Sequence, residues 1–145
     1  MNRLLSPYSL NTSLAALLLR LVFGGMFIYH GYPKITGYDQ MVGMFDPIGI
    51  GNDLSLILVI FAEFVCGILI VLGLFTRFAV IPVFITMAVA YFVAHGADKF
   101  DMKMIPFIYL WLCAVLFILG SGRYSLDAII FKNKNNNKIA DYENS

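Results

Sequence analysis

Charged residues are scarce in this sequence, and their scarcity excludes a water-soluble fold. Charged residues make up 13% of the 145 residues, and hydrophobic residues make up 60%. In soluble domains about a quarter of the residues are charged and about a half are hydrophobic. Four apolar stretches, residues 14–32, 54–75, 78–94 and 104–120, together contain two charged side chains, Arg20 and Glu63. We therefore expect an integral membrane protein with the lipid bilayer as its surroundings.

Residues that build redox and metal centres are also few. The two cysteines, Cys66 and Cys113, have no CxxC partner, which excludes a redox dithiol, a zinc knuckle and a c-type haem attachment. We expect both to be small buried hydrophobes. The sequence contains no flavin, haem or iron–sulfur motif and no metal-ligand spacing. A net charge of +1 without a basic face does not indicate nucleic-acid binding.

The apolar stretches have the length of transmembrane helices. At about 1.5 Å per residue, residues 54–75 span roughly 33 Å, and a hydrocarbon core is about 30 Å thick. The two stretches that begin at residues 78 and 104 are shorter, and each needs a flanking turn to cross. None of the stretches alternates apolar with polar residues, so barrel strands are excluded. The predicted fold is an all-α integral membrane four-helix bundle, with helices near 14–32, 54–75, 77–97 and 104–120.

The remaining segments complete one predicted domain over residues 1–131. Between the first two spans, four residues are spaced for one apolar face: Tyr38, Met41, Val42 and Phe45. This pattern predicts a short interfacial or re-entrant helix. The first span contains Arg20 and is followed by no small-x-small cleavage pattern, so we expect it to be retained and not removed as a signal peptide. Residues 132–145, rich in Asn and Lys, are expected to be a disordered polar tail.

Basic residues beside the spans predict the orientation. One side receives six of them, Arg3, Arg77, Arg123, Lys132, Lys134 and Lys138, and the other receives three, Lys34, Lys99 and Lys103. Cytoplasmic loops of membrane proteins are enriched in Lys and Arg. Both termini are therefore expected in the cytoplasm.

The two charged residues within the spans need an explanation. A charge near the centre of a transmembrane helix costs about 2.5 to 3.5 kcal/mol on insertion scales, so it indicates a partner or a function. Glu63 lies near the middle of the second stretch, and Arg20 lies about two turns into the first. An Arg20–Glu63 ion pair is geometrically plausible. Such a pair would either fix the register of the helices or form a site that exchanges protons or binds a ligand.

The first helix carries a stripe that should face the bundle. Its residues recur at spacings of four and three: Arg20, Gly24, Phe27, Gly31 and Lys34. The glycines on this stripe, with Gly67 in the second span, are expected to let helices approach closely.

Further polar residues gather at the outer ends of the first and third helices, where we find His30, Lys34, Tyr91 and His95. Neutral histidines and a tyrosine can hydrogen-bond a quinone carbonyl, and a membrane carboxylate can exchange protons with it. The alternatives are ordinary interfacial histidines, a solvated lysine rim and aromatic anchoring. A metal site is disfavoured, because neither histidine has a partner at ligand spacing.

Short motifs along residues 14–130 resemble one known family. They are Arg20-Leu-Val-Phe-Gly24, Phe27-Ile-Tyr-His-Gly-Tyr-Pro-Lys34, Glu63-Phe-Val-Cys-Gly67, Gly73-Leu-Phe-Thr-Arg77, His95 and Gly120-Ser-Gly-Arg-Tyr-Ser-Leu-Asp127. In this order and spacing the chain resembles the DoxX family of small bacterial four-helix membrane proteins, which includes the DoxD-type subunit of thiosulfate:quinone oxidoreductase. The resemblance implies a bacterial inner-membrane protein that is associated with an oxidoreductase or linked to quinones. The family's polar positions map onto Arg20, His30, Lys34, Glu63, Arg77 and His95.

Three hypotheses follow for the function. In the first, the protein is the quinone-binding membrane component of an oxidoreductase, with Glu63 and Arg20 as a catalytic, proton-exchanging pair. The cofactor-binding residues would be His30, Lys34, Tyr91 and His95, and a partner subunit or soluble donor would supply electrons. In the second, the protein is a non-enzymatic scaffold, assembly factor or small-molecule binder whose ion pair stabilises the bundle. The third, a transporter, would require a homo-oligomer, because four helices are few for alternating access.

Overall fold

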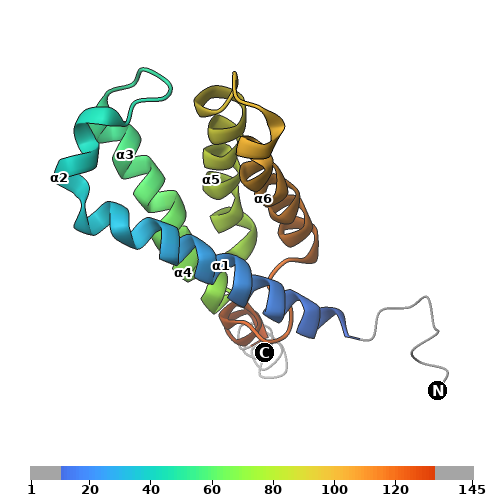
Figure 1. Ribbon diagram of the computed structural model, residues 1–145. Helices are drawn as coiled ribbons and strands as arrows, with labels where there is room; N and C mark the ends of the chain where they lie inside the picture. The colour runs from blue at the N-terminus through green and yellow to red at the C-terminus, as the bar shows by residue number, and fades with distance from the viewer. Residues whose placement is uncertain (1–10, 133–145) are drawn as a thin grey trace, which may run out of the picture.

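A computed structural model describes residues 11–132 and shows a bundle of long helices (Figure 1). The first span, α1 (Thr12–Thr36), is followed by the short helix α2 (Tyr38–Met41) and the 3-10 turn η1 (Val42–Met44). The second span joins α3 (Asn52–Ile60), the π-helical turn η2 (Phe61–Val65) and α4 (Cys66–Leu72). The third joins α5 (Thr76–Val89) to a second π-helical turn, η3 (Ala90–Ala94), and the fourth is α6 (Phe100–Leu119).

These elements confirm the predicted fold class. Four helices are long and apolar enough to cross a membrane, and residues 11–132 form no strand. The second span ends at Leu72, three residues earlier than expected, because Gly73 adopts the left-handed conformation with φ of 68° and caps the helix. The third span ends at Ala94, where His95 is the C-cap. Apart from Lys132, the predicted tail lies outside the described residues.

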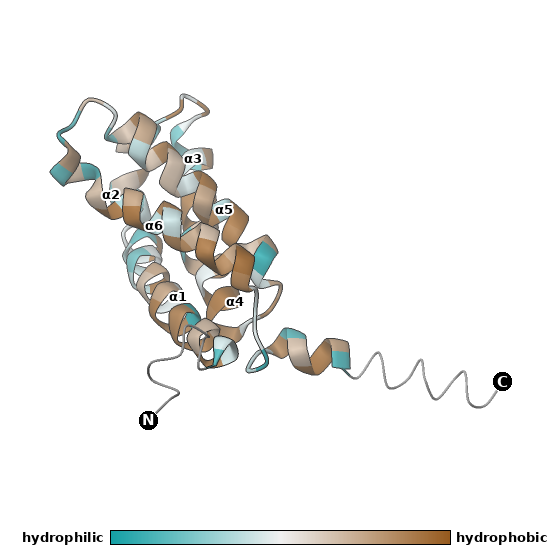
Figure 2. Ribbon diagram, turned by 90° about the vertical axis from the view of Figure 1, so that its right-hand side faces the viewer, coloured by the Kyte–Doolittle hydropathy of each residue, from teal (hydrophilic) through white to brown (hydrophobic). Residues whose placement is uncertain are grey.

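The outward surface of the bundle is apolar, as a bilayer requires. Large hydrophobic side chains are exposed on every span, among them Val22, Ile57, Phe78 and Ile118. Figure 2 shows hydrophobic residues along the whole length of the long helices, with hydrophilic residues mainly near their ends. Side chains of this kind remain exposed only where lipid takes the place of water. We conclude that this is a membrane protein.

The helices α1 and α4 cross at glycines, as the sequence predicts. A Cβ atom added to Gly24 would lie 2.7 Å from the carbonyl oxygen of Gly67, and one added to Gly31 would lie 2.8 Å from the backbone nitrogen of Phe64. Close backbone approach at small residues stabilises helix pairs in membranes, where hydrophobic burial contributes little. The contact fixes the register of α1 against the second span.

The interior between the spans is filled by apolar side chains. One cluster joins residues of all four spans: Phe23, Phe27, Cys66, Ile70, Ala79, Val80, Val83, Met87, Cys113 and Leu116. Tyr109 packs edge-on against the rings of Phe23 and Phe27, with centroids 5.7 and 4.9 Å away. Both cysteines are buried and free, which confirms their expected role as small hydrophobes.

The bundle has two distinct ends. The upper end, at the top of Figure 1, holds residues 37–51 and 95–99, and the lower end holds residues 73–75 and 120–125. The short helix expected after the first span is present as α2 with η1. It stays at the upper end, between the last turn of α1 and the start of α3, which favours the interfacial interpretation over the re-entrant one.

Candidate functional site

A cavity of about 510 Å³ lies between α3 and α5 near the upper end, and we call it the upper cavity. Figure 1 shows the ribbons of α3 and α5 diverging toward this end. Most of its wall is apolar and includes Met44, Phe45, Ile48, Leu58, Val59, Ile85 and Val89. Its polar groups are few: Lys34, Asp46, Ser55, Glu63, Thr86 and His95. A mostly apolar cavity with a few convergent polar groups is typical of a small-molecule binding site.

An ion pair forms one wall of the upper cavity. Lys34 Nζ lies 2.5 Å from Glu63 Oε2, and the two side chains are 20% and 8% exposed. Lys34 also donates a hydrogen bond to the carbonyl oxygen of His30. The pair forms because Gly31 brings α1 close to Phe64 and Glu63, so the last turn of α1 lies beside the acid. A carboxylate that is buried in a membrane helix thus has its compensating charge at the cavity wall.

Two π-helical turns border the upper cavity. The first, η2, contains Glu63, and the second, η3, contributes Ala90 and Ala94 to the wall and ends at His95. A π-helical turn changes the direction of the side chains that follow it, and such turns are frequent at functional sites. Neither turn was predicted, because apolar periodicity does not distinguish a π-helical turn from an α-helical one.

Besides the ion pair, the cavity wall contains a histidine that is hydrogen-bonded to an acid. His95 Nδ1 lies 2.8 Å from Asp98 Oδ2, and both side chains are partly exposed. Such a hydrogen bond orients the imidazole and selects which ring nitrogen faces other partners. Because Asp98 occupies Nδ1, Nε2 remains available.

Two of the sequence-predicted site residues lie away from the cavity. His30 is exposed on α1, beside the ring of Tyr29. Tyr91 packs against Phe107 and lies beneath the Lys103 ammonium, which is 5.0 Å from its ring centre. The structure therefore brings together Lys34, Glu63 and His95, but places His30 and Tyr91 outside the cavity wall.

The expected Arg20–Glu63 pair does not form. Arg20 is 1% exposed and lies at the lower end, where Nη2 donates a hydrogen bond of 2.6 Å to the carbonyl oxygen of Tyr124. Arg20 and Lys34 are 14 residues apart, about 21 Å along the helix. The antiparallel crossing at Gly24 and Gly67 sets Lys34 beside Glu63 and Arg20 beside the end of α4. The stripe on α1 correctly predicted which face of this helix packs against the bundle. It did not predict the register of α1 against the second span.

At the lower end, Arg20 holds the C-terminal segment against the α4–α5 turn. The backbone nitrogen of Asp127 donates to the carbonyl oxygen of Gly73, and Asp127 Oδ1 accepts from the backbone nitrogen of Phe75. These bonds join the segments 73–77 and 120–127, which lie far apart in sequence. The two motifs thus form one structural junction with Arg20 inside it.

Sequence reasoning did not single out Asp46 as a site residue, although this acid organises the loop over the upper cavity. Its carboxylate accepts hydrogen bonds from the backbone nitrogens of Ile50 and Gly51 and from the hydroxyl of Ser55. The Ser55 bond, together with the backbone bonds, lowers the pKa of Asp46 below its ordinary value. An acid followed by proline and glycines, as in residues 46–51, is a recognisable turn signal.

This loop should loosen at acid pH. Because the pKa of Asp46 is lower in the folded protein, its stabilising effect is complete above the ordinary aspartate pKa of about 3.9 and is lost as pH falls through the folded value. We expect the amide protection factors of Ile50 and Gly51 in hydrogen exchange to be constant near neutral pH and to drop below about pH 4. Asp46→Asn should show the low protection at every pH, whereas Asp39→Asn on α2 should not. Equal protection in Asp46→Asn and the wild type would contradict this assignment.

Comparison with known proteins supplies the family. Residues 15–96 match the DoxX family, which is more than half of the chain. This protein belongs to the DoxX family. A relative in Haemophilus influenzae is uncharacterized and is 33% identical, covering 79% of this chain and 89% of its own. A protein of Bacillus subtilis named "Putative oxidoreductase CatD" is 29% identical over 88% of this chain and 95% of its own. An uncharacterized membrane protein of Mycobacterium tuberculosis is 32% identical over 79% and 80%. No solved structure matches.

The part that matches the DoxX family contains the polar groups of the upper cavity. It runs from the first turn of α1 to the residue after His95, so it includes Lys34 and Glu63. The helix α6 and the segment 120–127 follow it. The resemblance inferred from short motifs is thereby confirmed, and the family's expected architecture is the one observed.

Proposed function

We propose that this DoxX protein binds a quinone head group in the upper cavity, as a membrane component of an oxidoreductase system. The observation that carries the proposal is the convergence of the Lys34–Glu63 ion pair and His95 on a largely apolar cavity of about 510 Å³. A relative that spans nearly the same length, CatD, has an oxidoreductase name. This supports the redox interpretation over a scaffold that uses the ion pair only for stability.

The wall of the cavity fits a quinone. A quinone ring is flat and apolar and carries two carbonyl acceptors, so it needs apolar walls and a few hydrogen-bond donors. Lys34 and Thr86 supply donors, and Leu58, Ile85 and Val89 supply apolar surface. Leu58 and Ile85 are also exposed on the membrane-facing surface, where an isoprenoid tail would meet lipid. When bound, a quinone supplies redox chemistry that takes up two electrons and two protons.

Three residues of the cavity have proposed roles in hydrogen bonding and proton exchange. The Lys34 ammonium donates to Glu63 and to the carbonyl oxygen of His30, and its third N–H can donate to a ligand in the cavity. Glu63, whose Oε2 accepts from the Lys34 ammonium, is the carboxyl group of the cavity wall that can exchange protons with a bound quinone. His95, oriented by Asp98, can donate a hydrogen bond from Nε2 to a quinone carbonyl and can exchange a proton there with water at the upper end. The proposed proton-exchanging pair is therefore Glu63 with Lys34, and Arg20 has no part in it.

The proposal places the protein in the bacterial inner membrane. The lower end carries Arg77, Arg123 and Lys132, and the upper end carries Lys34, Lys99 and Lys103. With Arg3, Lys134 and Lys138 added from the sequence, the excess of basic residues favours a cytoplasmic lower end and cytoplasmic termini. A partner subunit or a soluble donor supplies the electrons in this scheme, because the sequence contains no flavin, haem or iron–sulfur motif.

Binding of a quinone can be tested on two matched histidines. We expect the purified protein in nanodiscs to bind menadione and a short-chain ubiquinone in equilibrium dialysis. The variant His95→Gln should weaken binding about ten-fold, the value of one hydrogen bond to a positioned group. His30→Gln should leave binding unchanged, because His30 is exposed outside the cavity.

A second variant fills the cavity itself. Ala90→Phe adds an aromatic ring in the wall of the upper cavity and should abolish binding of both quinones. The unfolding midpoint of each variant shows whether it is folded. Failure of the folded wild type to bind either quinone, or equal weakening by the two histidine variants, would contradict the proposal and favour a scaffold function.

A further inference from the structure

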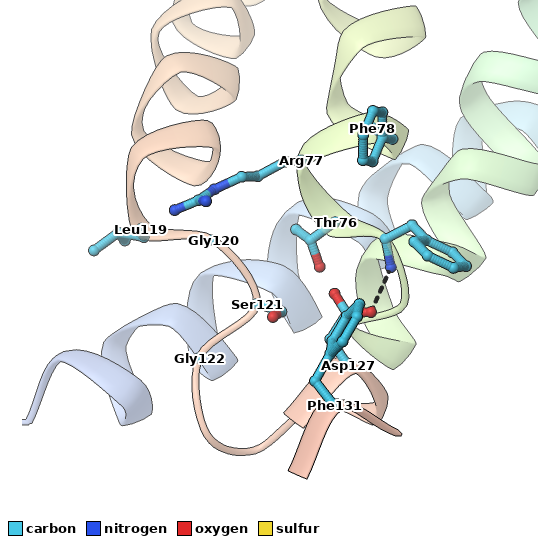
Figure 3. Close-up of a pocket in the computed structure, with 10 residues that line it drawn as sticks. Thr76, Arg77, Phe78, Leu119, Gly120, Ser121, Gly122, Asp127 and Phe131 are labelled. Carbon is cyan, nitrogen blue, oxygen red and sulfur yellow. Dashed lines mark hydrogen bonds between the residues drawn. The ribbon is translucent and has the colours of Figure 1, made fainter. Parts of the chain in front are cut away.

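A second cavity lies at the lower end, where α5 begins and α6 ends. This lower pocket has a volume of about 390 Å³ and is shown in Figure 3. Its polar side chains are Thr76, Arg77, Ser121 and Asp127, and its rim is formed by Phe75, Phe78, Leu119 and Phe131. Arg77 is the second residue of α5, so the pocket lies at the boundary of the membrane-spanning region.

Arg77 provides the positive charge of the lower pocket. Its Nε donates a hydrogen bond to the carbonyl oxygen of Phe117, which holds the guanidinium over the end of α6. Within residues 11–132, the ion pairs are Lys34–Glu63 and His95–Asp98, and neither involves Arg77. The other nitrogens of this exposed side chain therefore remain available to an anion.

Thr76 supplies a second, independent indication of a ligand. The residue is 1% exposed, and its hydroxyl has no hydrogen-bond partner among the described residues. In Figure 3 the hydroxyl points into the space between Ser121 and Asp127. A buried hydroxyl without a partner is unfavourable, so a ligand oxygen in the pocket would satisfy it.

Asp127 also lines the pocket, but its carboxylate is already hydrogen-bonded within the protein. Its Oδ1 accepts a hydrogen bond from the backbone nitrogen of Phe75, as the dashed line in Figure 3 shows. This bond satisfies one carboxylate oxygen of Asp127 within the protein. Among the described residues that line the pocket, Arg77 is the one basic side chain.

A separate apolar groove lies beside the lower pocket. It lies between α5 and α6 and is lined by Val80, Ile81, Phe84, Cys113, Ala114, Phe117 and Ile118. Ile81 and Phe84 lie four and seven residues after Arg77, which is one face of α5. Phe117 belongs to the groove and also binds Arg77 through its carbonyl oxygen. Phe117 thus links the cation to the groove, and the pocket and the groove, which share no lining residue, are neighbouring parts of the surface between α5 and α6.

We propose that this surface binds an anionic phospholipid, with its phosphate at Arg77 and Thr76 and an acyl chain in the groove between α5 and α6. The phosphodiester oxygens match a guanidinium and a hydroxyl donor, and the chain matches a groove with almost no polar surface. This site is separate from the upper cavity and does not depend on the quinone proposal.

The single tryptophan allows a direct test. Trp111 is exposed on α6, one helical turn before Ala114 of the groove. The full-length protein is placed in phosphatidylcholine vesicles with a low fraction of brominated phosphatidylglycerol or, separately, the same fraction of brominated phosphatidylcholine. Bromine quenches Trp111 when the chain lies beside it. We expect phosphatidylglycerol to associate about five-fold more strongly, as one basic residue near the lipid surface provides.

Three variants separate the parts of the site. Arg77→Gln should reduce the preference to parity, and Arg123→Gln, which removes an exposed cation near the lower end but outside the pocket, should retain it. Ala114→Phe fills the groove without changing any charge and should also remove the preference, so the test does not depend on one variant being folded. Circular dichroism compares the fold of all three.

Clear outcomes would overturn the proposal. Equal quenching by the two brominated lipids in the wild type would do so, as would an Arg77→Gln protein that retains the preference. Loss of the preference on adding inorganic phosphate at constant ionic strength would show that a free anion occupies the pocket and that the acyl chain contributes nothing.

Discussion

Replacing Lys34 with methionine is expected to lower the free energy of unfolding by about 3 to 5 kcal/mol, as the loss of one partner of a buried ion pair does. Methionine keeps most of the volume of the side chain but leaves the 8% exposed carboxylate of Glu63 without its counter-charge. Reversible unfolding in mixed micelles of dodecyl sulfate and a mild detergent measures the change.

The reverse substitution should be less harmful, and the double variant should recover most of the loss. In Glu63→Gln the lysine keeps its charge, but Lys34 is 20% exposed in the last turn of α1 and can extend its ammonium toward water. The double variant leaves no unpaired charge. Lys103→Met is a matched control, since its ammonium lies over Tyr91 and bonds a carbonyl without an acid partner. Strictly additive effects of the two single variants would show that the pair contributes no coupling energy.

Gly73→Ala is expected to destabilise the protein by about 3 kcal/mol or more. The left-handed backbone of Gly73 costs a residue with a side chain about 1 to 2 kcal/mol. A methyl group there would also collide with the Arg20 guanidinium and lie 2.5 Å from the Cβ of Ser125, and crowding of this kind costs about 1 to 3 kcal/mol. The same unfolding assay measures the combined loss of stability from backbone strain and crowding.

The expected consequence at the lower end is specific. Displacing Arg20 breaks its bond to Tyr124, so hydrogen exchange should increase in the segment 120–127 before the rest of the bundle. Gly49→Ala is the control: Gly49 has a φ of 73°, close to that of Gly73, but nothing lies within 4 Å of an added Cβ. Gly49→Ala should therefore lose only the stability that corresponds to the strained backbone, about 1 to 2 kcal/mol. If the two alanine variants are equally stable, packing around Arg20 does not constrain Gly73.

The polar residues that the sequence singled out serve two separate parts of the molecule. Lys34, Glu63 and His95 meet at the upper cavity, whereas Arg20 organises the lower end, and Arg77 borders the lower pocket. A charged residue inside the bundle is therefore not by itself a sign of a catalytic role in this protein. Variants of Arg20 should be interpreted as changes of the lower-end junction.

Hydrophobic length and helical spacing were enough to predict the membrane fold and the faces of its helices. Hydrophobic length alone predicts four spans, because a bilayer requires about 20 apolar residues per crossing. The spacing of Gly24, Gly31 and Lys34 identified the side of α1 that faces the bundle. The sequence also singled out Glu63 and Arg20 as charges within the spans, and it placed four polar residues at the outer helix ends: His30, Lys34, Tyr91 and His95.

Which of these residues meet could not be predicted from single helices. Partner choice depends on the relative height of two helices, and the crossing at Gly24 and Gly67 set that height so that Glu63 faces Lys34 and not Arg20. The lower-end junction likewise depends on contacts between residues distant in sequence, and the π-helical turns depend on a local change of helical repeat. Neither is encoded in the periodicity of a single helix.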